Sequence, residues 1–158
     1  EHPVSELVTG IDLVREQVRI AAGERLAMAG RAPRRGHAIE IRINAEDPAN
    51  GFAPAPGLIE RFTPPLGPGV RVDTAIESGS EIPPYYDSLI AKVIVLDADR
   101  PAAIARAVRA LEELEVEGIP TTKELALDVL RSPGFAGGVY STGDLDELEA
   151  HRPSLRPA

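Results

Sequence analysis

The stretch His37-Ala38-Ile39-Glu40-Ile41-Arg42-Ile43-Asn44 decides the fold, because apolar and polar residues alternate strictly from Ile39 onward. Successive side chains of a β-strand point to opposite faces of the sheet. The three isoleucines therefore share one face, and Glu40, Arg42 and Asn44 share the other. The pattern predicts a half-buried strand whose second face is wholly polar.

The chain before this strand is predicted to be helix and then loop. Apolar residues recur at helical spacing over residues 4–22, and Gly10 is expected to separate a short first turn from a longer helix. Residues 24–36 contain two glycines, a proline and four arginines, which is typical of a surface loop.

The chain after this strand predicts a small sheet. Further strands are expected at residues 58–63, 70–77 and 89–96, and a last one at 137–142. Strands framed by helices, rather than alternating with them, favour an α+β fold with a mixed or antiparallel sheet and flanking helices.

Two helices follow the strand at 89–96. Asp99 is expected to cap the first one, and its buried stripe is predicted to be Ile104, Val108, Leu111 and Leu114. Thr121 and Glu124 have the spacing of a capping box, which predicts a second helix that ends near Leu130.

Composition excludes several classes of protein. The 158 residues carry 17 Lys+Arg against 25 Asp+Glu, a net charge of −8, and no cysteine. An acidic chain lacks the basic footprint that nucleic-acid binding needs, and no apolar run approaches the ~20 residues that span a bilayer. The absence of cysteine rules out thiolate metal sites and fits a reducing compartment. The three histidines have no metal-ligand spacing, so no metal site is predicted.

A few polar side chains could carry chemistry. Arg42 could present its fork of donors to a carboxylate, bicarbonate or phosphate, or form a cross-strand salt bridge on a solvated face. Glu1 could act as a general base, or belong to a solvated terminus. Lys92 is expected to be a surface lysine, with a buried ion pair as the alternative. Tyr85 and Tyr86 could form a recognition surface, although burial is the commoner outcome for such rings.

Several segments together resemble the C-terminal domain of biotin carboxylase, the ATP-grasp component of biotin-dependent carboxylases. The matching strings occur in the family's order from residue 1 to about residue 142. The two most specific strings are Arg42-Ile43-Asn44-Ala45-Glu46-Asp47-Pro48 and Pro83-Pro84-Tyr85-Tyr86-Asp87-Ser88, and other matching strings include Glu1-His2-Pro3-Val4 and Gly69-Val70-Arg71-Val72-Asp73.

The resemblance implies a fold and a domain organisation. The fold would be the family's α+β C-terminal domain, of a rudimentary barrel-sandwich hybrid type, over residues 36–142. Residues 1–23 would be a helical segment that continues from the ATP-grasp region, and residues 143–158 a C-terminal tail.

The resemblance also implies an activity. The family uses ATP to activate bicarbonate as carboxyphosphate, and the CO2 released carboxylates N1 of biotin on a carrier protein. By motif, Glu1 resembles the glutamate that deprotonates bicarbonate, and Arg42 resembles the arginine that binds bicarbonate and stabilises the biotin enolate. The resemblance places supporting residues near that site and an arginine at the dimer interface. The supporting residues are Glu40, Tyr85, Tyr86 and Asp87, and the interface residue is Arg71.

The family string Glu-Met-Asn-x-Arg-x-Gln-Val, which precedes Glu-His-Pro, is missing here, together with the regions that hold ATP and Mg2+. We therefore expect a fragment that is inactive alone. Residues 64–69 also depart from the family's glycine-rich loop at the dimer contact.

Implied partners are the missing ATP-grasp regions, a biotin carboxyl carrier protein or domain, a carboxyltransferase and a second copy in a homodimer, all in the cytoplasm. Acetyl-CoA carboxylase of fatty acid biosynthesis would be one setting, but the acyl acceptor is not encoded here. The alternative is a non-catalytic structural or dimerisation module.

Overall fold

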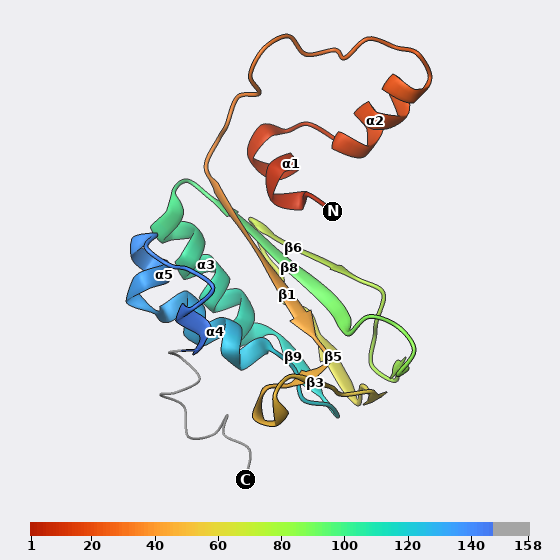
Figure 1. Ribbon diagram of the computed structural model, residues 1–158, viewed down its shortest axis with the longest axis vertical. Helices are drawn as coiled ribbons and strands as arrows, with labels where there is room; N and C mark the ends of the chain where they lie inside the picture. Colours follow the sequence, from red (N-terminus) through yellow and green to blue (C-terminus); the bar gives the residue numbers. More distant parts are fainter. Residues whose placement is uncertain (147–158) are drawn as a thin grey trace.

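The computed structural model describes residues 1–146, and a three-stranded antiparallel sheet lies at its centre (Figure 1). Its strands are β1 (His37–Asn44), β8 (Leu89–Asp97) and β6 (Val70–Thr74), in the order β1-β8-β6. Ile41 pairs with Val93 in register, and Val93 pairs with Val72. The strand predicted at residues 37–44 is therefore confirmed with the bounds expected for it, as an edge strand of this sheet.

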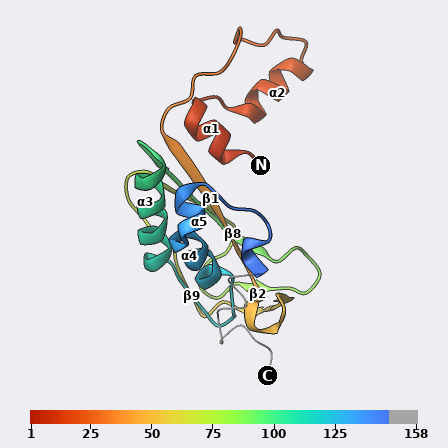
Figure 2. The ribbon, with the colours of Figure 1, turned by 60° about the vertical axis from the view of Figure 1, so that its left-hand side comes forward.

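Helices α3 (Arg100–Glu113), α4 (Lys123–Arg131) and α5 (Pro133–Gly137) lie on one side of this sheet (Figures 1 and 2). They bury the isoleucine face of β1, so this interface is the hydrophobic core. The most enclosed core side chains are Ile43, Ile59, Val93, Val95, Leu111 and Leu114.

The buried side of α3 differs from the expected stripe. Ala103, Ala107 and Ala110 are fully buried, whereas Ile104 and Val108 are only partly buried beside the core. Small side chains let the helix backbone approach the sheet closely, and the larger ones then fill the space at the flanks. The expected cap is confirmed, because the Asp99 carboxylate accepts a hydrogen bond from the Ala102 amide.

Three two-stranded antiparallel ladders surround the lower end of the central sheet. Their members are β2 (Glu46–Asp47) with β3 (Ala53–Pro54), β4 (Gly57–Leu58) with β7 (Glu81–Ile82), and β5 (Arg61–Thr63) with β9 (Glu115–Glu117). A short 3-10 helix, η1 (Pro48–Asn50), joins β2 to β3. The strand expected at 58–63 is thus divided. Its backbone changes partner in the middle, since Ile59 donates to the Ser80 carbonyl and Glu60 donates to the Glu117 carbonyl.

Helix α1 (Pro3–Thr9) packs against β1 and β8 on the side of the sheet away from α3 (Figure 1). Ile94 is fully buried but lies outside the main core, on this second face. Gly10 ends α1 in the left-handed conformation with φ 71°, as expected for a break.

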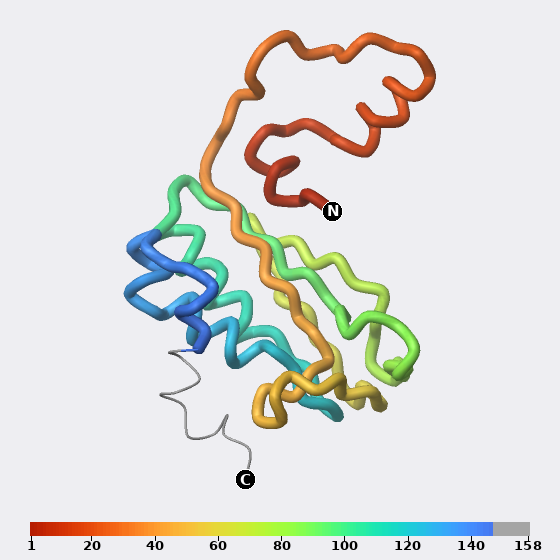
Figure 3. The backbone as a smooth tube through the Cα atoms, in the orientation of Figure 1, coloured from red at the N-terminus to blue at the C-terminus, as the bar shows by residue number. Residues whose placement is uncertain are grey.

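Helix α2 (Leu13–Ala21) projects beyond the sheet, and residues 22–36 return from it to β1 (Figure 3). Its apolar side chains Val14, Val18 and Ile20 are more than half exposed. Within residues 1–146 no helix is long and apolar enough to cross a membrane.

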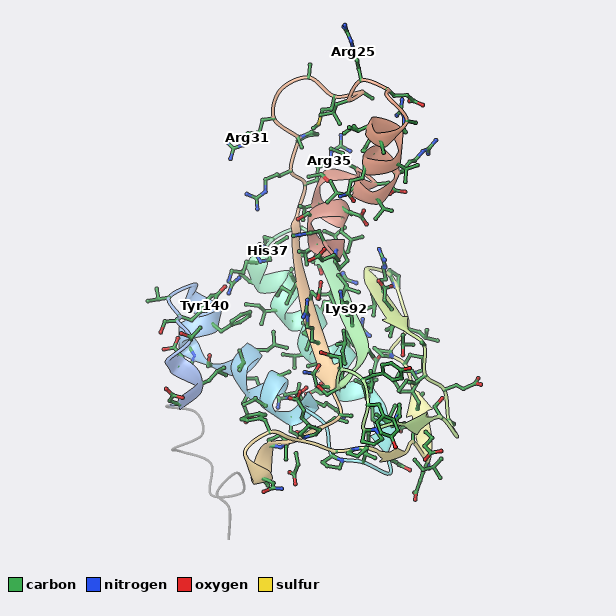
Figure 4. All side chains as sticks on the ribbon, turned by 45° about the vertical axis from the view of Figure 1, so that its right-hand side comes forward. Arg25, Arg31, Arg35, His37, Lys92 and Tyr140 are labelled. Atoms are coloured by element: carbon green, nitrogen blue, oxygen red, sulfur yellow. The ribbon has the colours of Figure 1, made fainter. Side chains whose placement is uncertain are left out.

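An arginine joins the C-terminal helices to the start of β1. Arg100 donates to the Phe135 carbonyl at 2.5 Å and lies 3.2 Å from His37 Nε2. Its guanidinium also stacks on the rings of Phe135 and Tyr140, which contact each other at 5.0 Å. Figure 4 labels His37 and Tyr140 at the two ends of this cluster. The strand expected at 137–142 is wrong, because Tyr140 packs on Phe135 and pairs with no strand.

Glycine is required at position 118, because the backbone of Leu58 passes very close to it. Gly118 has φ +104°, and a Cβ there would lie 2.2 Å from the Leu58 carbonyl oxygen. We expect Gly118→Ala to lower the free energy of unfolding by about 1–3 kcal/mol more than Gly79→Ala, because overpacking adds to backbone strain. Gly79 also has positive φ, +90°, but open space around it. Urea unfolding of the two variants measures the difference, and equal losses would contradict the backbone contact.

The His37 environment predicts a pH dependence of stability. Burial, and then the Arg100 charge, lower the pKa of His37 below its ordinary value. Above pH ~6.5 the ring is neutral in both states and stability is complete. As the pH falls below that, the unfolded chain takes up the proton first, so stability declines until folded His37 also protonates. Between pH 7 and pH 5, the free energy of unfolding should fall less steeply in His37→Gln than in the unmodified chain. Identical slopes would contradict a lowered pKa of His37 in the folded state.

Candidate functional site

The polar face of the central sheet brings charged residues from all three strands together. Arg42 on β1 pairs in register with Lys92 on β8, and Lys92 pairs with Asp73 on β6. Figure 4 shows Lys92 on the middle of the sheet, well away from the arginines of residues 22–36. Residues paired directly across antiparallel strands present their side chains on the same face. This row of charges is therefore the candidate functional site.

Glu40 lies between two cations at this site. Its Oε1 is 3.3 Å from Arg42 Nε and 3.8 Å from Lys92 Nζ. The side chains of Glu40 and Lys92 are only 14% and 19% exposed, whereas that of Arg42 is 61% exposed. Lys92 therefore forms the ion pair that the sequence left open as the alternative to a surface lysine, with both side chains largely but not fully buried. Arg42 bonds along its own strand to Glu40, not across strands as one reading of the sequence expected.

The site can bind an anion. Arg42 and Lys92 against the Glu40 carboxylate leave a local charge of about +1, because the Asp73 carboxylate is paired with Arg71. Among the hydrogen bonds within residues 1–146, Arg42 uses only Nε, so the terminal nitrogens of its fork remain for a ligand. A guanidinium offers parallel donors that match a carboxylate-shaped anion such as bicarbonate.

A second polar cluster joins the two most specific sequence strings in space. Glu46 Oε1 accepts from Asn44 Nδ2 at 3.0 Å and from Ser88 Oγ at 2.5 Å. The Ala45 amide donates to the Ser88 carbonyl at 2.7 Å. The Asn44 Oδ1 atom is buried and has no hydrogen-bond partner in the described part of the chain. The loop that carries Tyr85, Tyr86 and Asp87 is thus tied to the end of β1.

Thr122 closes the outer edge of β1, a role that the sequence did not reveal. Its Oγ1 accepts from the Asn44 amide at 3.0 Å and donates to the Arg42 carbonyl at 3.3 Å. The expected capping box at Thr121 is wrong, because α4 begins after Thr122 and that hydroxyl serves β1 instead. The backbone from the Arg42 carbonyl to Asn44 is therefore anchored by the residue that immediately precedes α4.

A pocket of about 360 Å³ opens between β1 and α4 beside this anchor. Its polar lining includes Glu40, Arg42, Asn44 and Glu46. Phe52, which also lines it, has φ 60°, a strained backbone conformation for a bulky side chain. The pocket gives a ligand access to the edge of the polar face.

The remaining predicted residues lie at the margins of this face. Glu1 is exposed and precedes α1, which packs against β1. Asp87 is exposed and caps its own loop by accepting from the Leu89 amide at 2.8 Å. Tyr85 and Tyr86 are 86% and 83% exposed, so their expected burial is wrong. They project from a loop that two prolines separate from the sheet.

Arg71 lies on β6, the opposite edge strand from β1. Its Nε and Nη2 donate to the two carboxylate oxygens of Asp73, each at 2.7 Å. This pairing raises the pKa of Arg71 above its ordinary value. Within residues 1–146 no group of three His, Asp or Glu side chains could hold a metal ion.

Comparison with known families assigns the chain to one class of protein. Residues 40–147 match the family described as biotin carboxylase C-terminal domain, and residues 1–29 match the ATP-binding domain of the carbamoyl-phosphate synthase L chain. The chain belongs to the biotin carboxylase C-terminal domain family.

Individual relatives agree with this assignment. The chain is 52% identical over 149 residues to the biotin carboxylase of a Nostoc species, with 94% of this chain and 33% of the relative covered. It is 49% identical over 148 residues to the small subunit of Hydrogenobacter thermophilus 2-oxoglutarate carboxylase, with 93% and 31% covered. The chain spans about a third of the length of these curated relatives.

A solved structure shows the same fold. The biotin carboxylase domain of Hydrogenobacter thermophilus 2-oxoglutarate carboxylase, a dimer in complex with MgADP, ADP and bicarbonate, aligns with a TM-score of 0.91 at 46% identity. The alignment covers 100% of this chain and 34% of that one. The expected α+β class with small antiparallel sheets is confirmed.

The anchor at Thr122 gives a test of how β1 is held. Thr122→Val keeps the shape of the side chain but leaves the Asn44 amide without its acceptor, so we expect a loss of about 1–3 kcal/mol in the free energy of unfolding. Thr121→Val is the matched control, because it removes only a long hydrogen bond of 3.4 Å from the Lys123 amide, and it should cost about 0.5 kcal/mol. Urea unfolding measures both. A larger loss of free energy of unfolding for Thr121→Val than for Thr122→Val would instead support Thr121 as the cap of α4.

Proposed function

We propose that this chain is the C-terminal part of a biotin carboxylase, which uses ATP and bicarbonate to carboxylate biotin on a carrier protein. The single observation that carries the proposal is the position of Arg42. It lies on the polar face of β1, within the residues that match the family, and the terminal nitrogens of its guanidinium are open to a ligand.

In this proposal Arg42 binds bicarbonate and later stabilises the negative charge that develops on biotin. A fixed guanidinium is most effective where charge appears in the transition state. Thr122 and the β1–β8 ladder hold its backbone, and the Glu40 carboxylate steadies Nε. Asp87, Tyr85 and Tyr86 support the site from the loop that Ser88 ties to Glu46.

Glu1 is proposed as the base that removes the bicarbonate proton. A base must lie within hydrogen-bond reach of that proton. Support comes from α1, which begins two residues after Glu1 and packs against β1 and β8.

Residues 1–146 bring together no cluster of acidic or histidine side chains able to hold Mg2+. We assign ATP and Mg2+ to the ATP-binding part of the enzyme, which supplies the phosphoryl group. The match of residues 1–29 to an ATP-binding domain supports this division, as does the exposed apolar side of α2. The chain alone is then inactive.

The proposed partners follow from the same division. A biotin carboxyl carrier protein or domain presents biotin, and a carboxyltransferase uses the product. A second copy forms a homodimer through the β6 edge with Arg71, which is supported by the exposure of this arginine. Residues 36–142 form the domain, of the family's barrel-sandwich hybrid type, and residues 143–158, mostly outside the described residues, form its tail.

The setting of the enzyme is proposed as cytoplasmic, with acetyl-CoA carboxylase of fatty acid biosynthesis as one example. Relatives of nearly equal similarity carry names from different carboxylases, so choice of the acyl acceptor is assigned to the carboxyltransferase. The purely structural or dimerisation module is the weaker proposal, because those relatives are carboxylases and carboxylase subunits.

The central test uses a chimaera in which this chain replaces the matching third of the Nostoc biotin carboxylase. We expect Arg42→Ala to lower the biotin-dependent rate of ATP hydrolysis by about 10²–10³-fold, the effect of losing one preorganised donor. Arg131→Ala, which removes an exposed arginine paired with Glu112, is the matched control and should leave the rate within about twofold. An Arg42→Ala chimaera as active as this control would refute the catalytic role.

A further inference from the structure

We propose that Lys92 is a positioning residue, which keeps the Arg42 guanidinium available for bicarbonate by competing with it for the Glu40 carboxylate. The inference rests on the proposed function, because it assumes that Arg42 binds an anion. It adds a residue that none of the expected catalytic or supporting roles included.

The position of Lys92 is unusual for a lysine. It lies on β8, the middle strand, whose neighbours Ala91, Val93 and Ile94 are all buried. Its side chain is only 19% exposed, and its Nζ reaches Glu40 Oε1 at 3.8 Å. A charge in such a place costs free energy unless a partner compensates it. Glu40 is that partner in the described part of the chain.

Arg42 and Lys92 share the Glu40 carboxylate, and this sharing limits how much of the Arg42 guanidinium Glu40 can bind. Both cations approach the same oxygen, Oε1, and the Arg42 contact is made by Nε alone at 3.3 Å. The terminal nitrogens of Arg42 make no hydrogen bond within residues 1–146 and so remain open to a ligand. This contact differs from Arg71–Asp73, where Nε and Nη2 both bind one carboxylate at 2.7 Å and the fork is occupied.

Removal of Lys92 would change this balance. Glu40, with its side chain 14% exposed, would then have Arg42 as its single cation neighbour among the described residues. A poorly solvated carboxylate attracts a cation strongly, so Arg42 would turn its fork onto Glu40 as Arg71 does on Asp73. The local charge would fall from about +1 to zero, and bicarbonate would lose both its donors and its electrostatic attraction.

The geometry also separates this role from that of an ordinary structural ion pair. A structural pair would affect stability, and the loss of Lys92 would then leave bicarbonate binding unchanged. A positioning role requires that the effect on bicarbonate depend on the presence of the Glu40 carboxylate. The experiment is designed around that dependence.

The experiment measures steady-state kinetics of the chimaera with the Nostoc ATP-binding part. We expect Lys92→Met to raise the KM for bicarbonate about five- to tenfold while the KM for ATP stays within about twofold. Lys92→Arg, which keeps the charge, should restore the KM for bicarbonate to within about twofold. Arg109→Met removes a cation from an exposed pair with Glu113 and serves as the matched control.

The decisive comparison is Lys92→Met in a Glu40→Gln background. Without the carboxylate nothing captures Arg42, so the lysine substitution should then change the KM for bicarbonate less than about twofold. Thermal unfolding of each variant checks folding, and Lys92→Gln replaces Lys92→Met if the latter unfolds at the assay temperature.

Two results would overturn the inference. One is a Lys92→Met chimaera whose KM for bicarbonate matches that of Arg109→Met, and the other is an equally large effect in the Glu40→Gln background. If Arg42→Ala abolishes activity and either result is found, only the positioning role of Lys92 fails. If Arg42→Ala itself has no effect, the proposed function fails as well.

Discussion

The antiparallel pairing of β1 with β8 is the constraint on which the rest of the structure depends. It holds three isoleucines of β1 against α3 and α4, and in the same register it presents Glu40 and Arg42 on the opposite face. Because the side-chain period of a strand is two, a slip of one residue would bury the charges and expose the core. The free energy that forms the core therefore also positions the candidate site.

The site is held at its edges by contacts between segments distant in the chain. Thr122 binds the Arg42 carbonyl and the Asn44 amide, and Ser88 binds the Glu46 side chain just beyond β1. These contacts come from α4 and from the loop before β8, which both pack on or continue the central sheet. A single arginine thus receives its orientation from the core, one helix and one loop, and a partly buried lysine balances its neighbouring carboxylate.

Local patterns predicted much of this arrangement. The alternation in β1, the apolar run of β8 and the Asp99 cap of α3 were sufficient, because each depends on neighbouring residues only. Errors arose where distant contacts outweighed local preference. The strand expected at 58–63 changes partner at Ile59, and the Tyr140 ring packs with Phe135 against the distant Arg100 instead of belonging to a strand. The link from Lys92 to Glu40 spans 52 positions, so no local pattern could establish it.

The most direct measurement of the central claim is a crystal structure of the chimaera with bicarbonate bound. We expect a bicarbonate oxygen within about 3 Å of the terminal nitrogens of Arg42. Arg42 Nε should remain bonded to Glu40, and Lys92 should remain beside the same carboxylate. Bicarbonate bound elsewhere would contradict the role of Arg42. An Arg42 guanidinium with both Nε and a terminal nitrogen bonded to Glu40 while the ligand is present would contradict the role of Lys92.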